Sequence, residues 1–312
     1  MKKNAGQKKG KLIKTIRDSR QLLIMLLPAI VYVILFSYIP MFGIVLAFKD
    51  YNYVDGIFGS PWNGLQNFEY LFLSDKLWPL TRNTLLYNAA FILLGVIFQV
   101  FFAILLSELS GKWFKKVTQT MMFMPYFISW VVAVAIVQCI FGFESGIFNN
   151  FLEMIGLERI NIYSSTGVWP FLLTGFKIWK ETGYGTIVYM AAITGIDTSL
   201  YEAADVDGAT YIQKVWNITL PAIKPTIIIM TLLAIGQIFR GDFGLFYQLV
   251  GSNAAVLEVA DVIDLFVYRS LLTSGDIGMS SAAGLYQSVL CFVTIVFCNW
   301  IIKKIDPEYV LF

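Results

Sequence analysis

Histidine is absent from this 312-residue chain, and charged residues make up only 14% of it. Without imidazole there is no histidine metal ligand, no histidine general base and no serine–histidine or cysteine–histidine pair. The three cysteines, Cys139, Cys291 and Cys298, lie in apolar runs, where a cysteine behaves as a small hydrophobe, and they predict no disulfide framework. The chain also lacks a G-x-x-x-x-G-K-[ST] loop, because its nearest string, GQKKGKL at 6–12, has the wrong spacing and no hydroxyl. This chain is therefore not expected to hydrolyse ATP.

Apolar residues make up 57% of the chain and gather in long runs. A membrane-spanning helix needs about 20 mostly apolar residues. Uncharged runs of that size lie at 21–48, 83–107, 117–143 and 277–302. Two further candidates are 160–196, which contains three charged residues, and the shorter 225–239, which the uncharged 243–257 would lengthen or follow as a re-entrant piece. We predict an all-α integral membrane protein with six transmembrane helices.

Lysine and arginine placement predicts the orientation of these spans. With the N-terminus inside, cytoplasmic segments carry 15 of the 23 basic residues and outer loops carry 6, as the positive-inside rule requires. Residues 1–20 form a basic cytoplasmic tail suited to anionic lipid headgroups, 21–302 form the membrane domain, and 303–312 form a cytoplasmic C-terminal tail. The apolar stretch after the basic start is too long for a signal peptide, so we expect an uncleaved first span.

A polar stretch, EAADVDGATYIQKVWNITLP, runs from Glu202 to Pro221 between two apolar runs. Ser199 with Glu202 three residues on has the spacing of a capping box, which predicts a helix start. Gly208 suits the left-handed position that ends a helix. Asp205 and Asp207 gather beside this turn.

A second capping box at Thr210 and Gln213 predicts a second helix, and Pro221 is expected to begin the next span. The segment 197–221 is thus predicted to be a rigid helix–turn–helix on the cytoplasmic side. An ordinary amphipathic loop on the membrane would need neither the glycine nor the clustered acids. Nucleic acid is excluded as a partner, because phosphate would repel an acidic tip.

The same stretch matches E-A-A, three residues, G, nine residues, I, one residue, L-P at every position. This pattern resembles the cytoplasmic coupling loop of permease subunits in type I, binding-protein-dependent ABC importers. The resemblance extends over nearly the whole chain and is to the branch that handles oligosaccharides and complex polysaccharides. The supporting stretches are GIVLAFKDYN (43–52), GSPWNGLQNF (59–68), ITGIDTSLYEAADVDGA (193–209), ADVIDLFVYRSLL (260–272), GMSSAAGLYQSV (278–289) and KKIDPEYVLF (303–312).

The resemblance implies a non-enzymatic permease that works by alternating access in a bacterial plasma membrane. Its implied partners are two ABC ATPase subunits, which bind ATP and Mg²⁺, a second six-span permease, and an extracytoplasmic solute-binding protein expected to be a lipoprotein. This chain itself would hold no cofactor. In the coupling loop, Glu202 would pair with a basic group on the ATPase, and Ala203, Ala204 and Gly208 would allow a close fit, with Asp205 and Asp207 beside them.

Charged residues inside a predicted span usually face a bundle interior or a water-filled path. Lys177 and Glu181 are four residues apart and can pair on one helix face, so a structural ion pair is the alternative to a substrate-path role. We take as candidate substrate-path residues Lys177, Trp179, Lys180, Glu181, Tyr184 and Gln237, the last together with Arg240 and Asp242.

Three other functions compete with oligosaccharide import. The same scaffold could carry a different solute, since the binding protein would decide between the two. A secondary transporter would use acidic or histidine side chains inside the membrane as ion sites, and the clean apolar runs contain almost none. An intramembrane enzyme would need a nucleophile with a base or a metal cluster, and the sequence has no such pattern.

Overall fold

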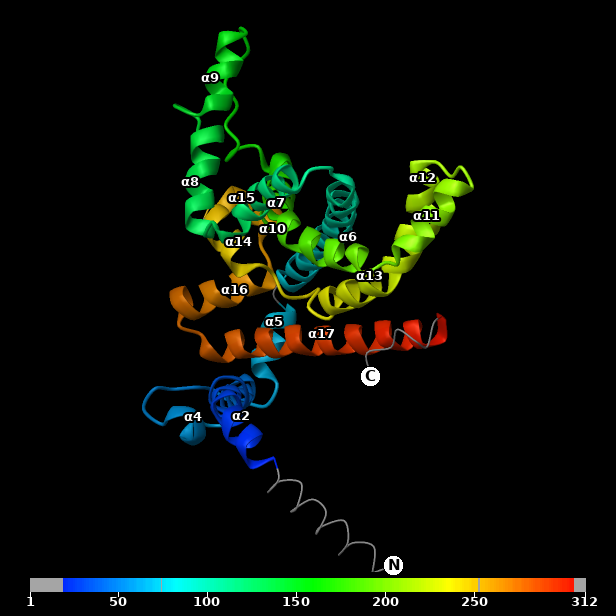
Figure 1. The fold of residues 1–312 in the computed structure, drawn as a ribbon. Helices are drawn as coiled ribbons and strands as arrows, with labels where there is room; N and C mark the ends of the chain where they lie inside the picture. The colour runs from blue at the N-terminus through cyan, green and yellow to red at the C-terminus, as the bar shows by residue number, and fades with distance from the viewer. Residues whose placement is uncertain (1–18, 74, 252, 306–312) are drawn as a thin grey trace, which may run out of the picture.

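The structure, a computed structural model, describes residues 19–73, 75–251 and 253–305. Within these residues every regular element is a helix, and the isolated β-bridge joins Lys49 and Trp62. The predicted all-α fold is confirmed (Figure 1). Most of the predicted basic tail 1–20 and most of the predicted tail 303–312 lie outside the described residues.

Four helical segments among the described residues are long and apolar enough to cross a membrane. These segments are Arg20–Phe48, Leu77–Glu108, Tyr211–Ile235 and Ile277–Lys304. Helix α10 (Trp169–Thr194) is 26 residues long but carries three charged residues near its middle. The third predicted span is a bent helix pair. A membrane domain is therefore clear, whereas the number of six spans stays a prediction.

The first of these segments combines α2 (Arg20–Val33), η1 (Ile34–Tyr38), α3 (Ile39–Met41) and η2 (Phe42–Phe48). None of the residues in its most apolar 18-residue window is buried within this chain. Its last part, η2, packs against α17 (Ile277–Ile305). A helix that is apolar all round must cover its surface elsewhere, so α2 faces lipid or another chain.

Helices α6 (Leu77–Glu108) and α10 pack along each other, and α7 (Lys112–Phe127) lies against α10. Val100, Ala103 and Tyr189 are buried in this packing together with Ile223 of α13 (Leu220–Ile235). Gly183 permits the approach of α7, because a Cβ there would collide with the backbone carbonyl of Met122. The central bundle is thus fixed by a close backbone contact as well as by apolar side chains.

The run 117–143, predicted as one span, is broken into α7 and α8 (Trp130–Phe141), which meet at an angle of 101°. Pro125 lies within the last turn of α7, and a proline removes one backbone N–H from the helix ladder. Ser129 then caps α8 by accepting a hydrogen bond from the Val132 N–H at 3.3 Å. The search for uncharged runs could not reveal this break, because the whole stretch 117–143 lacks charged residues.

Short helices form many of the connections between the long ones. They are α4 (Gly56–Gly59), α5 (Gln66–Leu73), α9 (Ile147–Met154), η3 (Thr166–Val168), α14 (Phe243–Leu249), α15 (Ala254–Ala260), α16 (Ile263–Arg269) and η5 (Ser270–Ser274). The uncharged run 243–257 therefore forms separate helices and does not lengthen the fifth span. Figure 1 places α14, α15 and α16 at the end of the bundle opposite α11 (Thr198–Val206) and α12 (Tyr211–Lys214).

Candidate functional site

The segment 197–221, called the coupling hairpin below, begins one helix at a different residue from the one predicted. Asp197, and not Ser199, is the N-cap of α11, and its carboxylate accepts a hydrogen bond from the Ser199 N–H at 2.9 Å. That hydrogen bond lowers the pKa of the Asp197 carboxyl. The predicted capping box of Ser199 and Glu202 is wrong because the aspartate two residues earlier takes the orphan N–H first.

The turn of the hairpin agrees with the sequence. Gly208 has a φ of +74°, the left-handed conformation that glycine adopts without steric cost. The N–H of Ala209 donates to Ala204 O at 2.9 Å and the N–H of Gly208 to Asp205 O at 3.1 Å. Together these two hydrogen bonds form a Schellman motif, which satisfies the last carbonyls of α11.

The second half of the hairpin is continuous with the following span. Thr210 and Gln213 form the predicted capping box, but the helix then runs through the π-helical turn η4 (Val215–Thr219) into α13 without a break. Pro221 was expected to begin the next span. It lies instead in the first turn of α13, which follows η4 directly within one continuous helix. The hairpin is a rigid extension of a spanning helix.

The surface of the coupling hairpin is acidic and apolar. Glu202 and Asp207 are exposed, whereas Asp205 joins α11 to α12 through an ion pair with Lys214 at 2.7 Å. Large apolar side chains that surround the acids are also exposed, namely Leu200, Val206, Ile212 and Trp216. Such an exposed apolar patch next to charges is typical of a protein–protein contact.

A second feature is a cavity of about 670 Å³ in the bundle, called the polar cavity below. It is lined mainly by α6, α10, and the end of α13 with the segment 237–242 that follows. Of the predicted substrate-path residues, the cavity brings together Lys177, Glu181, Tyr184 and Gln237, with Arg240 and Asp242. Its other polar lining residues are Asn88, Gln99, Tyr126, Tyr189, Asp264 and Gln287.

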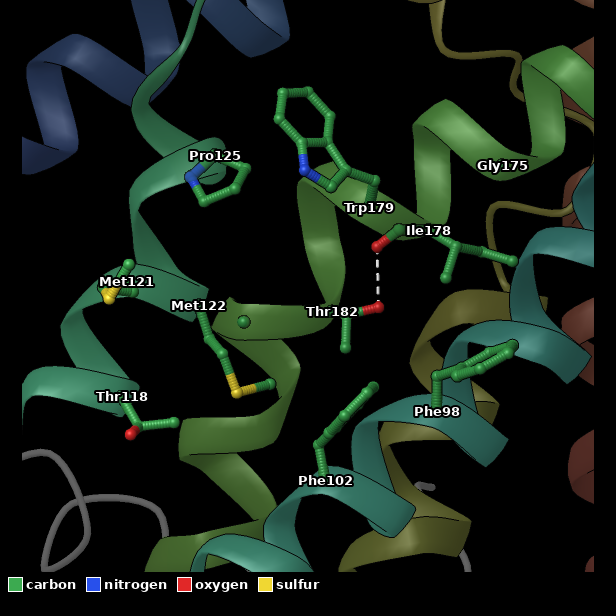
Figure 2. A pocket seen from close by; sticks show the side chains of 11 residues that line it. Phe98, Phe102, Thr118, Met121, Met122, Pro125, Gly175, Ile178, Trp179 and Thr182 are labelled. Carbon is green, nitrogen blue, oxygen red and sulfur yellow. Dashed lines mark hydrogen bonds between the residues drawn. The ribbon is translucent and has the colours of Figure 1, made fainter. Parts of the chain in front are cut away.

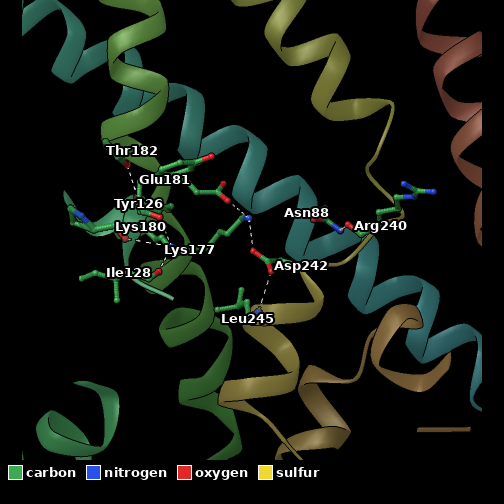
Figure 3. Close-up of polar contacts among 12 residues, drawn as sticks. Asn88, Tyr126, Ile128, Lys177, Lys180, Glu181, Thr182, Arg240, Asp242 and Leu245 are labelled. Atoms are coloured by element: carbon green, nitrogen blue, oxygen red, sulfur yellow. Dashed lines mark hydrogen bonds and ion pairs between the residues drawn. The ribbon is translucent and has the colours of Figure 1, made fainter. Parts of the chain in front are cut away.

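Lys177 is the centre of an ion cluster in this cavity (Figure 3). Its ammonium contacts Glu181 one turn along α10 and Asp242 Oδ2, which lies 2.8 Å away. The other oxygen of Asp242 caps α14 by accepting from the Leu245 N–H at 3.1 Å. The predicted pair of Lys177 and Glu181 is therefore present, and Asp242 completes it.

The comparisons with known proteins identify the family. A family model described as "Binding-protein-dependent transport system inner membrane component" matches residues 92–307. The chain belongs to this family. It is thus the permease component of a binding-protein-dependent ABC importer, lies in a membrane and is not an enzyme.

Similar proteins extend this likeness to the whole chain. The polygalacturonan/rhamnogalacturonan transport system permease protein YteP of Bacillus subtilis is 36% identical over 302 residues, which cover 97% of this chain and 94% of that protein. A crystal structure of a bacterial ABC transporter involved in the import of the acidic polysaccharide alginate contains a chain of 33% identity with a TM-score of 0.85, covering 95% of this chain and 99% of that one. A second crystal structure, of bacterial alginate ABC transporter in complex with alginate pentasaccharide-bound periplasmic protein, matches with a TM-score of 0.84 at 33% identity, covering 95% and 98% of the two chains.

Lys180 of this permease does not line the polar cavity. Its ammonium lies 2.7 Å from Tyr126 O and 3.4 Å from Pro125 O, and it also contacts Ile128 O. These carbonyls lie at the carboxyl end of α7, where a lysine charge offsets the helix dipole and donates hydrogen bonds to the last carbonyls. Lys180 thus stabilises the break between α7 and α8 and places Tyr126, whose ring stacks on Tyr184 with centroids 4.8 Å apart.

Trp179 also lies away from the polar cavity. Its indole borders an apolar hollow of about 590 Å³ between α6, α7 and α10, beside Pro125 and Ile178 (Figure 2). The hydroxyl of Thr182 donates to Ile178 O at 2.6 Å and so presents no free donor to this hollow. The geometry places Trp179 among apolar side chains and apart from the ion cluster.

Three polar residues that the sequence did not single out hold the segment 237–242 in place. Asp264 Oδ2 accepts from the Gly241 N–H at 2.6 Å and from Gln287 Nε2 at 2.7 Å. Gln287 Nε2 also donates to Phe239 O at 2.7 Å, and Asn88 Nδ2 donates to Arg240 O at 3.0 Å. Asn88 and Gln287 are amides within apolar runs, but Asn83, Gln99 and Asn299 lie in the same runs, so no signal in the sequence singles them out.

We expect Gly208→Val to reduce ATP-dependent uptake about tenfold relative to Gly208→Asn. An added Cβ at Gly208 meets no atom within 4 Å, so crowding is not the cause. The left-handed conformation costs an ordinary residue about 1–2 kcal/mol, and asparagine tolerates it better than a β-branched residue. Uptake would be measured at equal membrane levels of both variants. Equal uptake by the two would contradict a role for the turn conformation.

Proposed function

We propose that this permease imports oligosaccharides through the polar cavity and receives the energy of ATP hydrolysis through the coupling hairpin. The observation that carries the proposal is the cavity itself, because a polar wall inside an apolar bundle marks a solute path. Its amides offer hydrogen bonds to sugar hydroxyls, and the stacked rings of Tyr126 and Tyr184 offer a flat apolar face. Relatives named for polygalacturonan, rhamnogalacturonan and alginate transport support the substrate class.

The proposed complex contains two ABC ATPase subunits, which bind ATP and Mg²⁺, and a second six-span permease. A solute-binding protein outside the membrane, anchored as a lipoprotein, delivers the sugar. In this arrangement both termini of the chain and the coupling hairpin face the cytoplasm. ATP closure of the ATPase pair would move the hairpin, and since α12 continues into α13, that movement would reach the cavity wall at Gln237.

The test is purification of tagged full-length chain in mild detergent, followed by mass spectrometry of the retained proteins and reconstitution into vesicles. We expect an ABC ATPase and a second permease to co-purify, and labelled oligosaccharides to enter the vesicles only with ATP and the binding protein. Uptake driven by an ion gradient without ATP would favour the secondary transporter. ATP-dependent uptake of another solute class, with no uptake of oligosaccharides, would overturn the substrate assignment.

A further inference from the structure

The ionisable residues that line the polar cavity do not give it an excess of positive charge. They comprise two cations, Lys177 and Arg240, and three carboxylates, those of Glu181, Asp242 and Asp264. If all five are ionised, the carboxylates outnumber the cations by one. If Asp264 is protonated, the charges balance. In either state the cavity offers no surplus cation to an anionic solute.

Lys177 is already engaged by two carboxylates. It contacts Glu181 and lies 2.8 Å from Asp242, and only 15% of its side chain is exposed. A substrate carboxylate could bind Lys177 only by displacing one of these partners. The displaced carboxylate would then remain in the cavity wall without a cation, which is strongly unfavourable in a partly buried site.

Two further cations lie near this ion cluster, Lys180 outside the cavity and Arg240 in its wall. Lys180 is bound to the carbonyls at the end of α7. Figure 3 shows the side chain of Arg240 extending away from the pair of Lys177 and Asp242. Lys180 is thus engaged, and the side chain of Arg240 does not converge with Lys177 on one site, whereas recognition of a carboxylate favours convergent cations.

We propose that the polar cavity selects neutral oligosaccharides over acidic ones, and that Glu181 and Asp242 set this preference. The inference rests on the proposed function. Each uronic acid residue would bring a carboxylate into a wall that already holds three carboxylates against two cations, and burial of an unpaired charge is costly. Neutral sugars instead bring hydroxyl groups, which donate to the carboxylates and accept from the amides of Gln99 and Gln237. This permease therefore differs in substrate charge from the relatives named for alginate and polygalacturonan transport.

The test compares uptake of neutral and uronic acid oligosaccharides of equal length in vesicles that contain the complete transporter with its binding protein. We expect the wild-type protein to import the neutral sugars at least about tenfold faster. Asp242→Asn keeps the cap of α14, because asparagine is an equally good N-cap, but leaves Lys177 with one carboxylate. Its ratio of acidic to neutral uptake should rise about tenfold, a change of about 1.4 kcal/mol in relative affinity, and Glu181→Gln should act in the same direction.

A change in the ratio of acidic to neutral uptake between variants reports on the permease alone, since the same binding protein delivers the sugar to every variant. Glu153→Gln is the matched control, because it removes a carboxylate from the ion pair with Arg159, which does not line the cavity, and its ratio should equal that of wild type. An unchanged ratio in both cavity variants, or faster wild-type uptake of acidic sugars, would overturn this inference alone. Uptake of neither kind would overturn the proposed function and this inference with it.

Discussion

Glu202→Lys is expected to lower ATP-dependent uptake at least a hundredfold and to release the ATPase from the purified complex. Glu202 is exposed on α11, so the substitution should change the free energy of unfolding by no more than about 0.5 kcal/mol. At a protein–protein contact, by contrast, a lysine placed opposite the expected basic group of the ATPase weakens the binding free energy by several kcal/mol, because like charges repel. The measurement is the amount of ATPase retained by the tagged chain, together with uptake in vesicles.

Two variants make this result specific to the hairpin. Glu158→Lys introduces the same change at an exposed glutamate between α9 and η3 and should retain the ATPase fully. Glu202→Gln removes the attraction without adding repulsion, and its effect should lie between those of wild type and Glu202→Lys. ATPase retention at the wild-type level in Glu202→Lys would contradict the assignment of Glu202 to coupling.

Lys177→Met is expected to destabilise the permease by about 3 kcal/mol, the lower end of the range for breaking a buried ion pair. The substitution leaves Glu181 and Asp242 facing each other in the cavity without a cation. The exposed fraction of the Asp242 side chain is 20% and that of Glu181 is 40%, so water relieves part of the repulsion. We expect a lower midpoint of thermal unfolding in detergent and loss of uptake.

A matched pair of variants separates charge from side-chain packing. Lys177→Arg retains the cation and should keep most of the stability, although its planar group fits the two carboxylates differently. Adding Asp242→Asn to Lys177→Met removes one of the unpaired carboxylates and should recover part of the lost thermal stability. No recovery in the double variant would show that Lys177 acts through packing and not through its charge.

The coupling hairpin shows how far local sequence can be interpreted. Gly208 and the capping box of Thr210 and Gln213 were predicted correctly, because turns and caps depend on residues within four positions of one another. The same reasoning failed at Ser199, where Asp197 competed for the same N–H group. It failed again at Pro221, because a π-helical turn let the helix continue. The turn and the second cap of the coupling hairpin could therefore be predicted from the sequence, whereas the limits of its helices could not.

The polar cavity could be predicted only in part. The spacing within one helix correctly predicted that Lys177 and Glu181 form a pair, since residues four apart share a helix face. It also suggested Trp179 and Lys180 as neighbours, but consecutive residues of a helix point in directions about 100° apart. Which of those directions meets the cavity depends on how α10 packs against α6 and α7.

The sequence by itself determined the helical membrane fold and the acidic turn of the coupling hairpin, because these follow from composition and from contacts between near neighbours, and its motif indicated the family. Only the tertiary structure decided the charge of the cavity. Asp242 reaches Lys177 across 65 positions of sequence and Lys180 reaches Tyr126 O across 54. A long-range ion pair depends on the relative placement of separate helices, and apolar packing fixes that placement without leaving a periodic signal in the sequence.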